Sequence, residues 1–238
     1  MKLLVTGCGR GGTNLGIELA RSFGVFNVTP KVEDRDFFSH TPLPSKYATK
    51  LATENTNFTI ENIEKMLREN PDLHILFMIR HPVDTCLSKI YRGRPMSQGG
   101  DSTVEETAAD GTPTGAAKAI KNMVDIYSYL FKHRRNRLCV VKMENLIAEP
   151  EKTIEKVSLF FTAKPLESTY NFFETNRNRY QQQRYGNQLV RNVDLYMDLD
   201  NSFDGFFAEK QVQVSKLATL LDHLITTLQY TNKLKASK

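Results

Sequence analysis

The sequence predicts an α/β fold in which helices cover both faces of a parallel sheet, giving three layers. Short apolar runs typical of buried parallel strands alternate with segments whose apolar residues recur at helical spacing. The first run leads through a glycine-rich turn directly into a helical pattern. Such alternation favours parallel strands joined by crossover helices. Because no repeat or composition shift divides the chain, we expect a single domain over residues 1–238.

Four short runs rich in Val, Ile, Leu or Phe are expected to form the sheet. They are Lys2–Thr6, Val25–Thr29, His74–Ile79 and Leu138–Lys142. Ligands of parallel α/β sheets bind beyond the carboxyl ends of the strands. The residues that directly follow these runs are therefore the first candidates for a functional site.

Helical patterns separate and follow the expected strands. One of them begins directly after the glycine-rich turn, and two begin directly after a proline, a residue that suits the first turn of a helix. The six expected helices are Thr13–Phe23, Thr59–Glu69, Val83–Tyr91, Ala116–Phe131, Glu151–Phe161 and Ala208–Tyr230. Gly93–Gly115, rich in Gly, Ser, Thr and acidic residues, is expected to be a surface loop.

The composition narrows the class of protein. A net charge of +5 and a pI near 9.0 suit an anionic ligand, but they are modest for a protein that binds nucleic acid, and no long Lys/Arg block is present. Three cysteines do not make a disulfide framework. Without a signal peptide or a long apolar run, the expected location is cytoplasmic, with no membrane span.

The turn after the first expected strand carries the strongest functional signal. Glycines at positions 7 and 12 have the spacing of the phosphate-binding pattern G-x-x-x-x-G-K-[ST]. Such a turn lets backbone N–H groups at a helix start approach an anion closely. Thr13 stands where the pattern has its phosphate-binding lysine, and Asn14 where it has the Mg²⁺ ligand. The turn therefore predicts a site for a phosphate-like group, but not for ordinary Mg·ATP chemistry.

A second signal follows the third expected strand. Arg80-His81-Pro82-Val83-Asp84 leads into a helix that carries Ser88 about two turns further on. An arginine fork and a serine hydroxyl can bind one phosphate together. The alternative is that Arg80 pairs with Asp84 as a salt bridge at the helix start.

A third stretch follows the fourth expected strand. Met143-Glu144-Asn145-Leu146, with Pro150 shortly after it, is expected to form an acidic turn before a helix. By itself it has a simple interpretation, because Glu144 and Asn145 side chains can accept hydrogen bonds from backbone N–H groups in a turn.

In this order, the three stretches resemble the motifs of sulfotransferases that use 3′-phosphoadenosine 5′-phosphosulfate (PAPS). The family patterns are like G-x-[PR]-[KR]-S-G-T-T, R-[DNH]-P-x-D-x-x-x-S and Y-E-D-L-x-x-x-P, and the corresponding residues here are 7–14, 80–88 and 143–150. The resemblance covers roughly residues 1–20 and 74–165. It implies a PAPS-dependent sulfotransferase with a fold like that of the P-loop nucleotide kinases. Gly11 departs from the usual Ser, and Asn14 from the second Thr.

The resemblance also implies roles for single residues. Arg80 and Ser88 would bind the 3′-phosphate of the donor, and Arg184, in a basic loop late in the chain, would contact it too. Arg10 would stabilise charge on the leaving oxygen. Because family members transfer sulfonate without a metal, none is expected here. The residues that would hold the 5′-phosphosulfate are Gly9, Arg10, Gly11, Gly12, Thr13 and Asn14.

Transfer to a hydroxyl or amine needs a base for the proton of the attacking group. In several branches of the resembled family, the base is a glutamate just after the second strand, where this chain has Glu33 and Asp34. Glu33 is the first candidate and Asp34 the second, with His40 and His81 as rival bases. The simpler alternative is a solvated acidic turn.

Two other functions compete with sulfonate transfer. A P-loop nucleoside or small-molecule kinase would depend on Mg²⁺, and a non-catalytic anion-binding protein would keep the fold without turnover. No motif identifies the acceptor, but the positive charge favours an acidic one, such as a saccharide, among hydroxyl compounds. We expect no nucleic-acid partner.

Overall fold

The computed structural model describes residues 1–29, 33–93, 111–171 and 213–236. These residues fall into two compact units. The first comprises Met1–Arg80 and Asp125–Tyr180, and the second comprises His81–Val124 and Gln181–Lys238. The single domain expected from the sequence stays a prediction.

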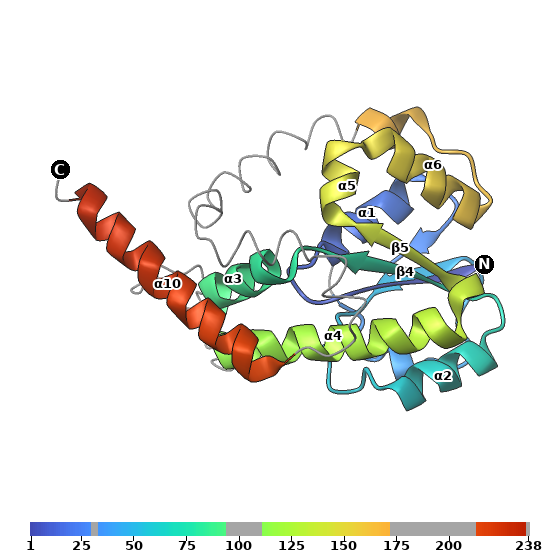
Figure 1. Ribbon diagram of the computed structural model, residues 1–238. Helices are drawn as coiled ribbons and strands as arrows, with labels where there is room; N and C mark the ends of the chain where they lie inside the picture. The colour runs from blue at the N-terminus through green and yellow to red at the C-terminus, as the bar shows by residue number, and fades with distance from the viewer. Residues whose placement is uncertain (30–32, 94–110, 172–212, 237–238) are drawn as a thin grey trace. The chain divides into compact units, whose positions relative to one another are not determined.

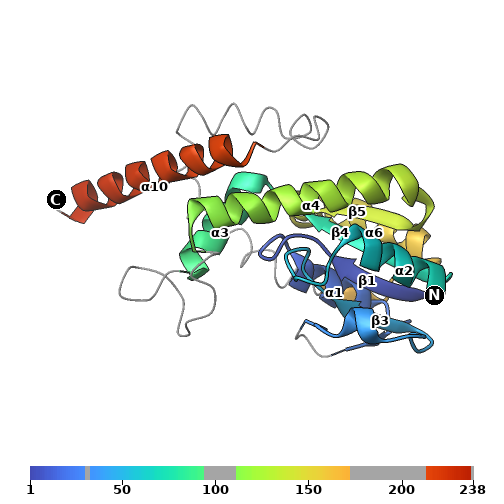
Figure 2. The ribbon, with the colours of Figure 1, turned by 90° about the horizontal axis from the view of Figure 1, so that it is seen from below.

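The first unit contains a parallel sheet of five strands in the order β2-β3-β1-β4-β5. Figure 1 shows β4 beside β5, and Figure 2 shows β1 at the centre of the sheet, between β3 and β4. All the strands run in one direction, so their carboxyl ends lie at one edge. The predicted α/β class with a parallel sheet is confirmed. The strands are β1 Lys2–Thr6, β2 Asn27–Val28, β3 Tyr47–Lys50, β4 Leu73–Ile79 and β5 Leu138–Lys142.

The sheet differs from the expectation at two strands. β2 is only two residues long, against the five expected over Val25–Thr29. β3 was not expected, because its sequence Tyr47-Ala-Thr-Lys lacks a continuous apolar run. It nevertheless pairs with β1 on one side and β2 on the other, and Lys50 is 7% exposed. Tertiary pairing has therefore made a buried strand from a polar segment.

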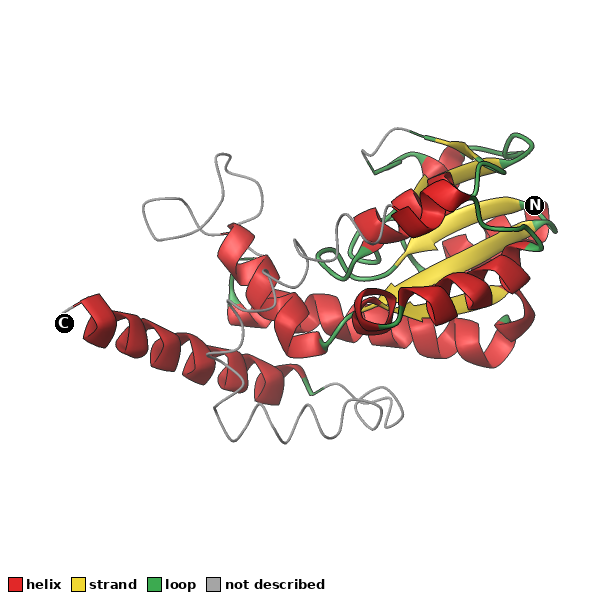
Figure 3. Cartoon of the chain, turned by 90° about the horizontal axis from the view of Figure 1, so that it is seen from above, coloured by secondary structure: helices red, strands yellow, loops and turns green. Residues whose placement is uncertain are grey.

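Helices cover both faces of this sheet (Figure 3). On one side lie α1 Thr13–Ser22, α5 Met143–Ala148 and α6 Pro150–Phe161. On the other lie α2 Ile60–Glu69 and the part of α4, Pro113–His133, that begins at Asp125. The expected acidic turn after β5 is wrong, because Met143 directly begins the short helix α5. Short 3-10 helices span Phe37–Ser39 and Arg135–Arg137.

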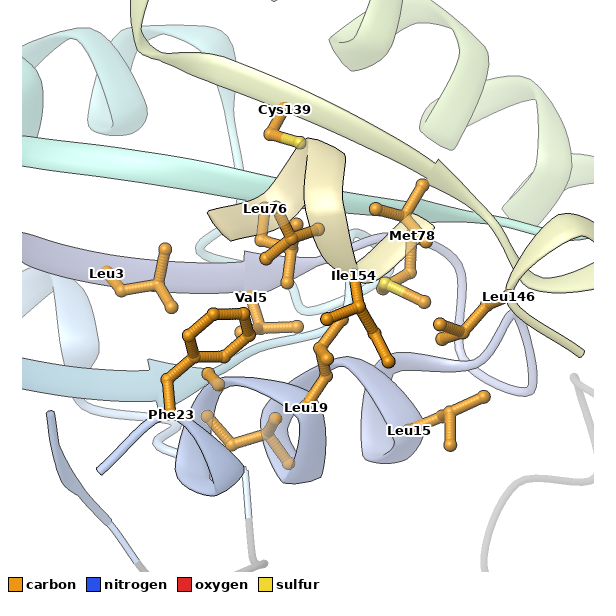
Figure 4. Close-up of a cluster of buried hydrophobic side chains, with 14 of the residues drawn as sticks. Leu3, Val5, Leu15, Leu19, Phe23, Leu76, Met78, Cys139, Leu146 and Ile154 are labelled. Carbon is orange, nitrogen blue, oxygen red and sulfur yellow. The ribbon is translucent and has the colours of Figure 1, made fainter. Parts of the chain in front are cut away.

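In the core of the first unit, different helices pack against the two faces of the sheet. Figure 4 shows Leu3 and Val5 of β1 and Met78 of β4 packed with Leu19 of α1 and Ile154 of α6. Alternate residues of a strand point to opposite faces. Phe77 accordingly faces the other way, and its ring centroid lies 5.6 Å from that of Tyr127 on α4.

The second unit contains α3 Pro82–Gly93, the first part of α4 and α10 Val214–Ala236. Helices α3 and α10 are in contact. The buried side chains of α10 include Leu217, Leu221 and Leu224. Most of the expected loop Gly93–Gly115 lies outside the described residues, as does the start of the helix expected at Ala208.

Gly16 lets α1 lie close to the sheet. A Cβ added there would lie 2.7 Å from Cγ of Met78 and 2.8 Å from Cγ1 of Val5. Both distances are shorter than van der Waals contact, so a side chain would force the helix outward. Because α1 directly follows the glycine-rich turn, the close packing of α1 on the sheet also determines where that turn lies.

Gly16→Ala tests this packing. Overpacking a core costs about 1–3 kcal/mol, whereas alanine adds roughly 1 kcal/mol of helix stability over glycine. Because the contacts would be as short as 2.7 Å, we expect a cost in the upper half of that range, so the free energy of unfolding, measured by urea denaturation, should fall by about 1–2 kcal/mol. Asn14→Ala, at an exposed position of the same helix, is the control and should change it by no more than about 0.5 kcal/mol. Equal stability of the two variants would contradict the close packing.

Candidate functional site

The loop between β1 and α1, residues 7–12, is shaped by close backbone contacts. Gly7 has φ 141°, and a Cβ there would lie 2.1 Å from the carbonyl oxygen of Met78. The N–H of Gly11 donates to the carbonyl of Cys8 at 2.8 Å. A Cβ on Gly11 would lie 2.7 Å from that same oxygen. This glycine loop therefore depends on glycine at specific positions, as the sequence pattern predicts.

The start of α1 suits an anion. Its N-cap is Gly12, which has φ 98° and provides no side-chain cap, and the first turn contains no acidic residue. The first N–H groups of a helix have no intrahelical acceptor and carry the positive end of its dipole. Thr13 is buried there, whereas Arg10 and Asn14 are exposed. An uncapped helix start beside an exposed arginine fits a phosphate-like group.

Two contacts bring the other motifs to the glycine loop. Nη1 of Arg80 donates to the carbonyl oxygen of Arg10 at 3.3 Å, so the residue after β4 meets the loop after β1. A Cβ on Gly12 would lie 3.2 Å from Sδ of Met143, the first residue of α5. Segments that are far apart in the sequence are therefore neighbours at the carboxyl edge of the sheet.

Other predicted site residues are not brought to the loop by these contacts. Ser88 is half-buried on α3, and His81 is 4% exposed just before that helix, both in the second unit. The pairing of Arg80 with Ser88 on a phosphate therefore stays a prediction. Arg184 lies outside the described residues.

Asp34 is engaged by two neighbouring side chains. The hydroxyl of Tyr47 donates to its Oδ2, and Nε2 of His40 lies 3.4 Å from its Oδ1. Asp34 is 15% exposed. Burial, together with the hydrogen bond and the charge of Asp34, raises the pKa of the Tyr47 phenol above its ordinary value. The carboxylate of Asp34 and the rival base His40 thus belong to one polar cluster.

Glu33 faces a buried cation. Its Oε1 lies 3.9 Å from Nζ of Lys50, the last residue of β3. The side chain of Glu33 is 31% exposed, whereas that of Lys50 is 8% exposed. Lys50 is a candidate functional residue that sequence reasoning missed, because β3 itself was not predicted.

A further carboxylate lies against the glycine loop. The backbone N–H of Gly9 donates to both oxygens of Glu54, at 2.8 and 2.9 Å. Glu54 follows β3 at the same edge of the sheet and was also missed. The sequence signal would have been an acidic residue shortly after a strand adjacent to β1, which requires β3 to be recognised first.

Among the residues that the structure describes, no group of three or more His, Cys, Asp or Glu side chains is arranged to hold a metal ion. In the same ranges, no helix has the length and apolar character needed to cross a bilayer. Metal independence and a cytoplasmic location stay predictions.

The sequence matches a family model described as the sulfotransferase family over residues 29–164, more than half of the chain. This range begins after the glycine loop and includes Glu33, Arg80, Ser88 and Glu144. A search of curated proteins finds no match.

Solved structures of sulfotransferases have a similar fold. A sulfotransferase from Alicyclobacillus acidocaldarius is 15% identical with a TM-score of 0.52, and 92% of this chain and 95% of that one are covered. Mouse SULT7A1 complexed with PAP is 15% identical with a TM-score of 0.51, covering 74% of this chain. The match spans 63% of the mouse chain, less than two thirds of its length.

The sulfotransferase domain from the curacin biosynthetic pathway is 9% identical with a TM-score of 0.51, and 71% of this chain and 76% of that one are covered. At identities this low, the three structures establish the fold alone. They confirm the sulfotransferase fold that the motifs predicted.

The polar cluster around Asp34 predicts an alkaline titration. The pKa of Tyr47 is raised in the folded protein above its unfolded value of about 10. The neutral phenol therefore stabilises the fold fully below about pH 10, and this contribution is lost as pH rises further. We expect the ultraviolet difference between wild type and Tyr47→Phe to show phenolate forming only above about pH 10.

Asp34→Asn provides the matched variant for this titration. It removes the charge that disfavours the phenolate, so the ionisation of Tyr47 should move back toward its ordinary range. Ionisation of Tyr47 at an ordinary pKa in the wild-type protein would contradict the cluster.

Proposed function

The chain belongs to the sulfotransferase family, and on this premise we propose that it transfers a sulfonate group from PAPS to a hydroxyl or amine of an acceptor. The observation that carries the proposal is the glycine loop. It combines an uncapped helix start, an exposed Arg10 and a contact with Arg80. A loop without the kinase lysine suits a donor whose transfer needs no Mg²⁺.

The proposed donor site uses backbone and side chains together. The amides at the start of α1 and the Thr13 side chain bind the 5′-phosphate, as anions at helix starts are bound in general. Arg10 stabilises the negative charge that develops on the bridging oxygen as the S–O bond breaks. Arg80 binds the 3′-phosphate, a role that the motif resemblance also gives to Ser88 and Arg184. The contact between Arg80 and the carbonyl of Arg10 supports two phosphate sites next to each other.

The proposed chemistry is an in-line displacement at sulfur. The acceptor oxygen or nitrogen attacks the sulfonate sulfur and loses its proton to Glu33. The bond from sulfur to the bridging oxygen breaks, and its electron pair leaves with adenosine 3′,5′-bisphosphate. Glu33 can act because a carboxylate placed beside the attacking group is a general base.

Glu33 is favoured over Asp34 by its surroundings. Both oxygens of Asp34 face Tyr47 or His40, so its carboxylate is committed to the polar cluster. Glu33 is twice as exposed, with 31% against 15% of the side chain accessible. The Lys50 ammonium at 3.9 Å can orient the Glu33 carboxylate without covering it.

The acceptor is proposed only by class. A net charge of +5 favours an acidic acceptor, and a saccharide hydroxyl is the first candidate. Turnover with labelled PAPS against panels of saccharides, phenols, lipids and peptides tests this class of acceptor.

Glu33→Gln tests the base. It keeps the size of the side chain but cannot accept the proton, so kcat should fall by about 10²–10⁴-fold. The Kd of adenosine 3′,5′-bisphosphate should stay unchanged. Asp34→Asn is the matched variant and should lower kcat by less than about tenfold. If Asp34→Asn abolishes turnover and Glu33→Gln does not, the assignment of the base is reversed.

Arg10→Ala tests the donor loop. Loss of the cation near the leaving oxygen should lower kcat/KM by about 10²-fold. Arg10→Lys keeps a positive charge and should recover part of the rate. Arg68→Ala removes an exposed arginine from the last turn of α2 and serves as the control. Equal rates for Arg10→Ala and Arg68→Ala would exclude Arg10 from the reaction.

A further inference from the structure

Glu54 is hydrogen-bonded to the glycine loop, and none of the three motifs includes this residue. Both of its carboxylate oxygens accept from the backbone N–H of Gly9, at 2.8 and 2.9 Å. Gly9 stands where the family pattern has Pro or Arg. A proline would have no N–H to donate and would restrict the backbone by its ring. Glycine leaves that position unrestricted and gives it a donor.

The chain around Glu54 is firmly held. The N–H of Thr53 donates to the carbonyl of Gly7 at 3.0 Å, which extends the pairing of β3 with β1 past the strand ends. The hydroxyl of Thr6 donates to the carbonyl of Leu51 at 2.7 Å. Thr6, Leu51 and Thr53 are all 0% exposed. Glu54 is therefore presented to the loop from a buried, hydrogen-bonded base.

We propose that Glu54 is a positioning residue that fixes the glycine loop through the N–H of Gly9 and so prepares it for the donor. The inference rests on the proposed function, in which Arg10, the next residue, stabilises the leaving oxygen. The backbone of Arg10 has φ 68°, a conformation that residues other than glycine rarely adopt. A carboxylate hydrogen bond on the preceding residue holds the backbone in that conformation. Charge-assisted hydrogen bonds of this kind are the strong ones.

Two competing roles make different predictions. If Glu54 were the general base, its charge would matter and Glu54→Gln would lose turnover. If Glu54 occupied the phosphate site as a competitor, any removal of its charge would tighten binding of adenosine 3′,5′-bisphosphate. A positioning residue needs only a hydrogen-bond acceptor, and the amide oxygen of glutamine provides one.

The first test needs no ligand and is independent of the proposed reaction. Amide exchange at Gly9, measured by NMR on the free ¹⁵N-labelled protein, should accelerate by about tenfold or more in Glu54→Ala. Glu54→Gln should keep most of the protection. Glu155→Ala, at an exposed position of α6, is the control and should exchange as the wild type does. If the Gly9 amide exchanges as slowly in Glu54→Ala as in the wild type, the proposal is overturned, even if the protein proves to be a sulfotransferase.

The second test reads binding and turnover separately. Glu54→Ala should weaken binding of adenosine 3′,5′-bisphosphate and raise the KM for PAPS by about tenfold. Glu54→Gln should bind and turn over within about threefold of the wild type. Loss of kcat in Glu54→Gln with unchanged binding would make Glu54 the base and overturn the proposal. Tighter binding by both variants would make it a competitor, with the same consequence. If the wild type neither binds the bisphosphate nor turns over PAPS, the proposed function fails. The exchange result still shows whether Glu54 holds the N–H of Gly9 by a hydrogen bond.

Discussion

The arrangement of the site depends on the contact between the backbone of Gly7 and that of Met78. A Cβ at Gly7 would lie 2.1 Å from the Met78 carbonyl oxygen, so only glycine lets the loop after β1 pass this close to β4. That closeness brings Arg80, two residues after Met78, to the carbonyl of Arg10. Gly16 allows α1 to pack closely against the same methionine, and the side chain of Met143 in α5 packs against Gly12. Glycines in the loop and in α1 thus allow residues of three distant motifs to lie close together at one edge of the sheet.

Three carboxylates near this edge have different surroundings, and these suggest different roles. Asp34 accepts from Tyr47 and lies beside His40, so it holds a polar cluster together. Glu33 is more exposed and faces the buried ammonium of Lys50, which leaves it able to meet an acceptor. Glu54 accepts from the backbone of Gly9 and orders the loop itself. Identical chemical groups are thus distinguished by their partners, as in other sites where paired carboxylates divide the work.

The sequence predicted the parts of this edge that depend on local patterns. The glycine loop is specified by backbone sterics, and β1, β4 and β5 are specified by apolar runs, so both could be read from the chain. β3 could not, because the burial of Thr49 and Lys50 comes from tertiary packing, which includes the pairing of β3 with β1 and β2. Lys50 and Glu54 were missed with it, since their roles arise from neighbours 17 and 45 residues away in the sequence. The helix α5 was taken for a turn because six residues are too few to show helical periodicity.

Metal-free binding of the bisphosphate product by the glycine loop can be measured by isothermal titration calorimetry. Wild-type protein in EDTA is titrated with adenosine 3′,5′-bisphosphate, and in a separate experiment with ATP and excess Mg²⁺. We expect saturable, stoichiometric binding of the bisphosphate in EDTA, weakened in Arg80→Ala, and much weaker binding of Mg·ATP. Binding of Mg·ATP alone, with no heat from the bisphosphate, would contradict it and favour the kinase.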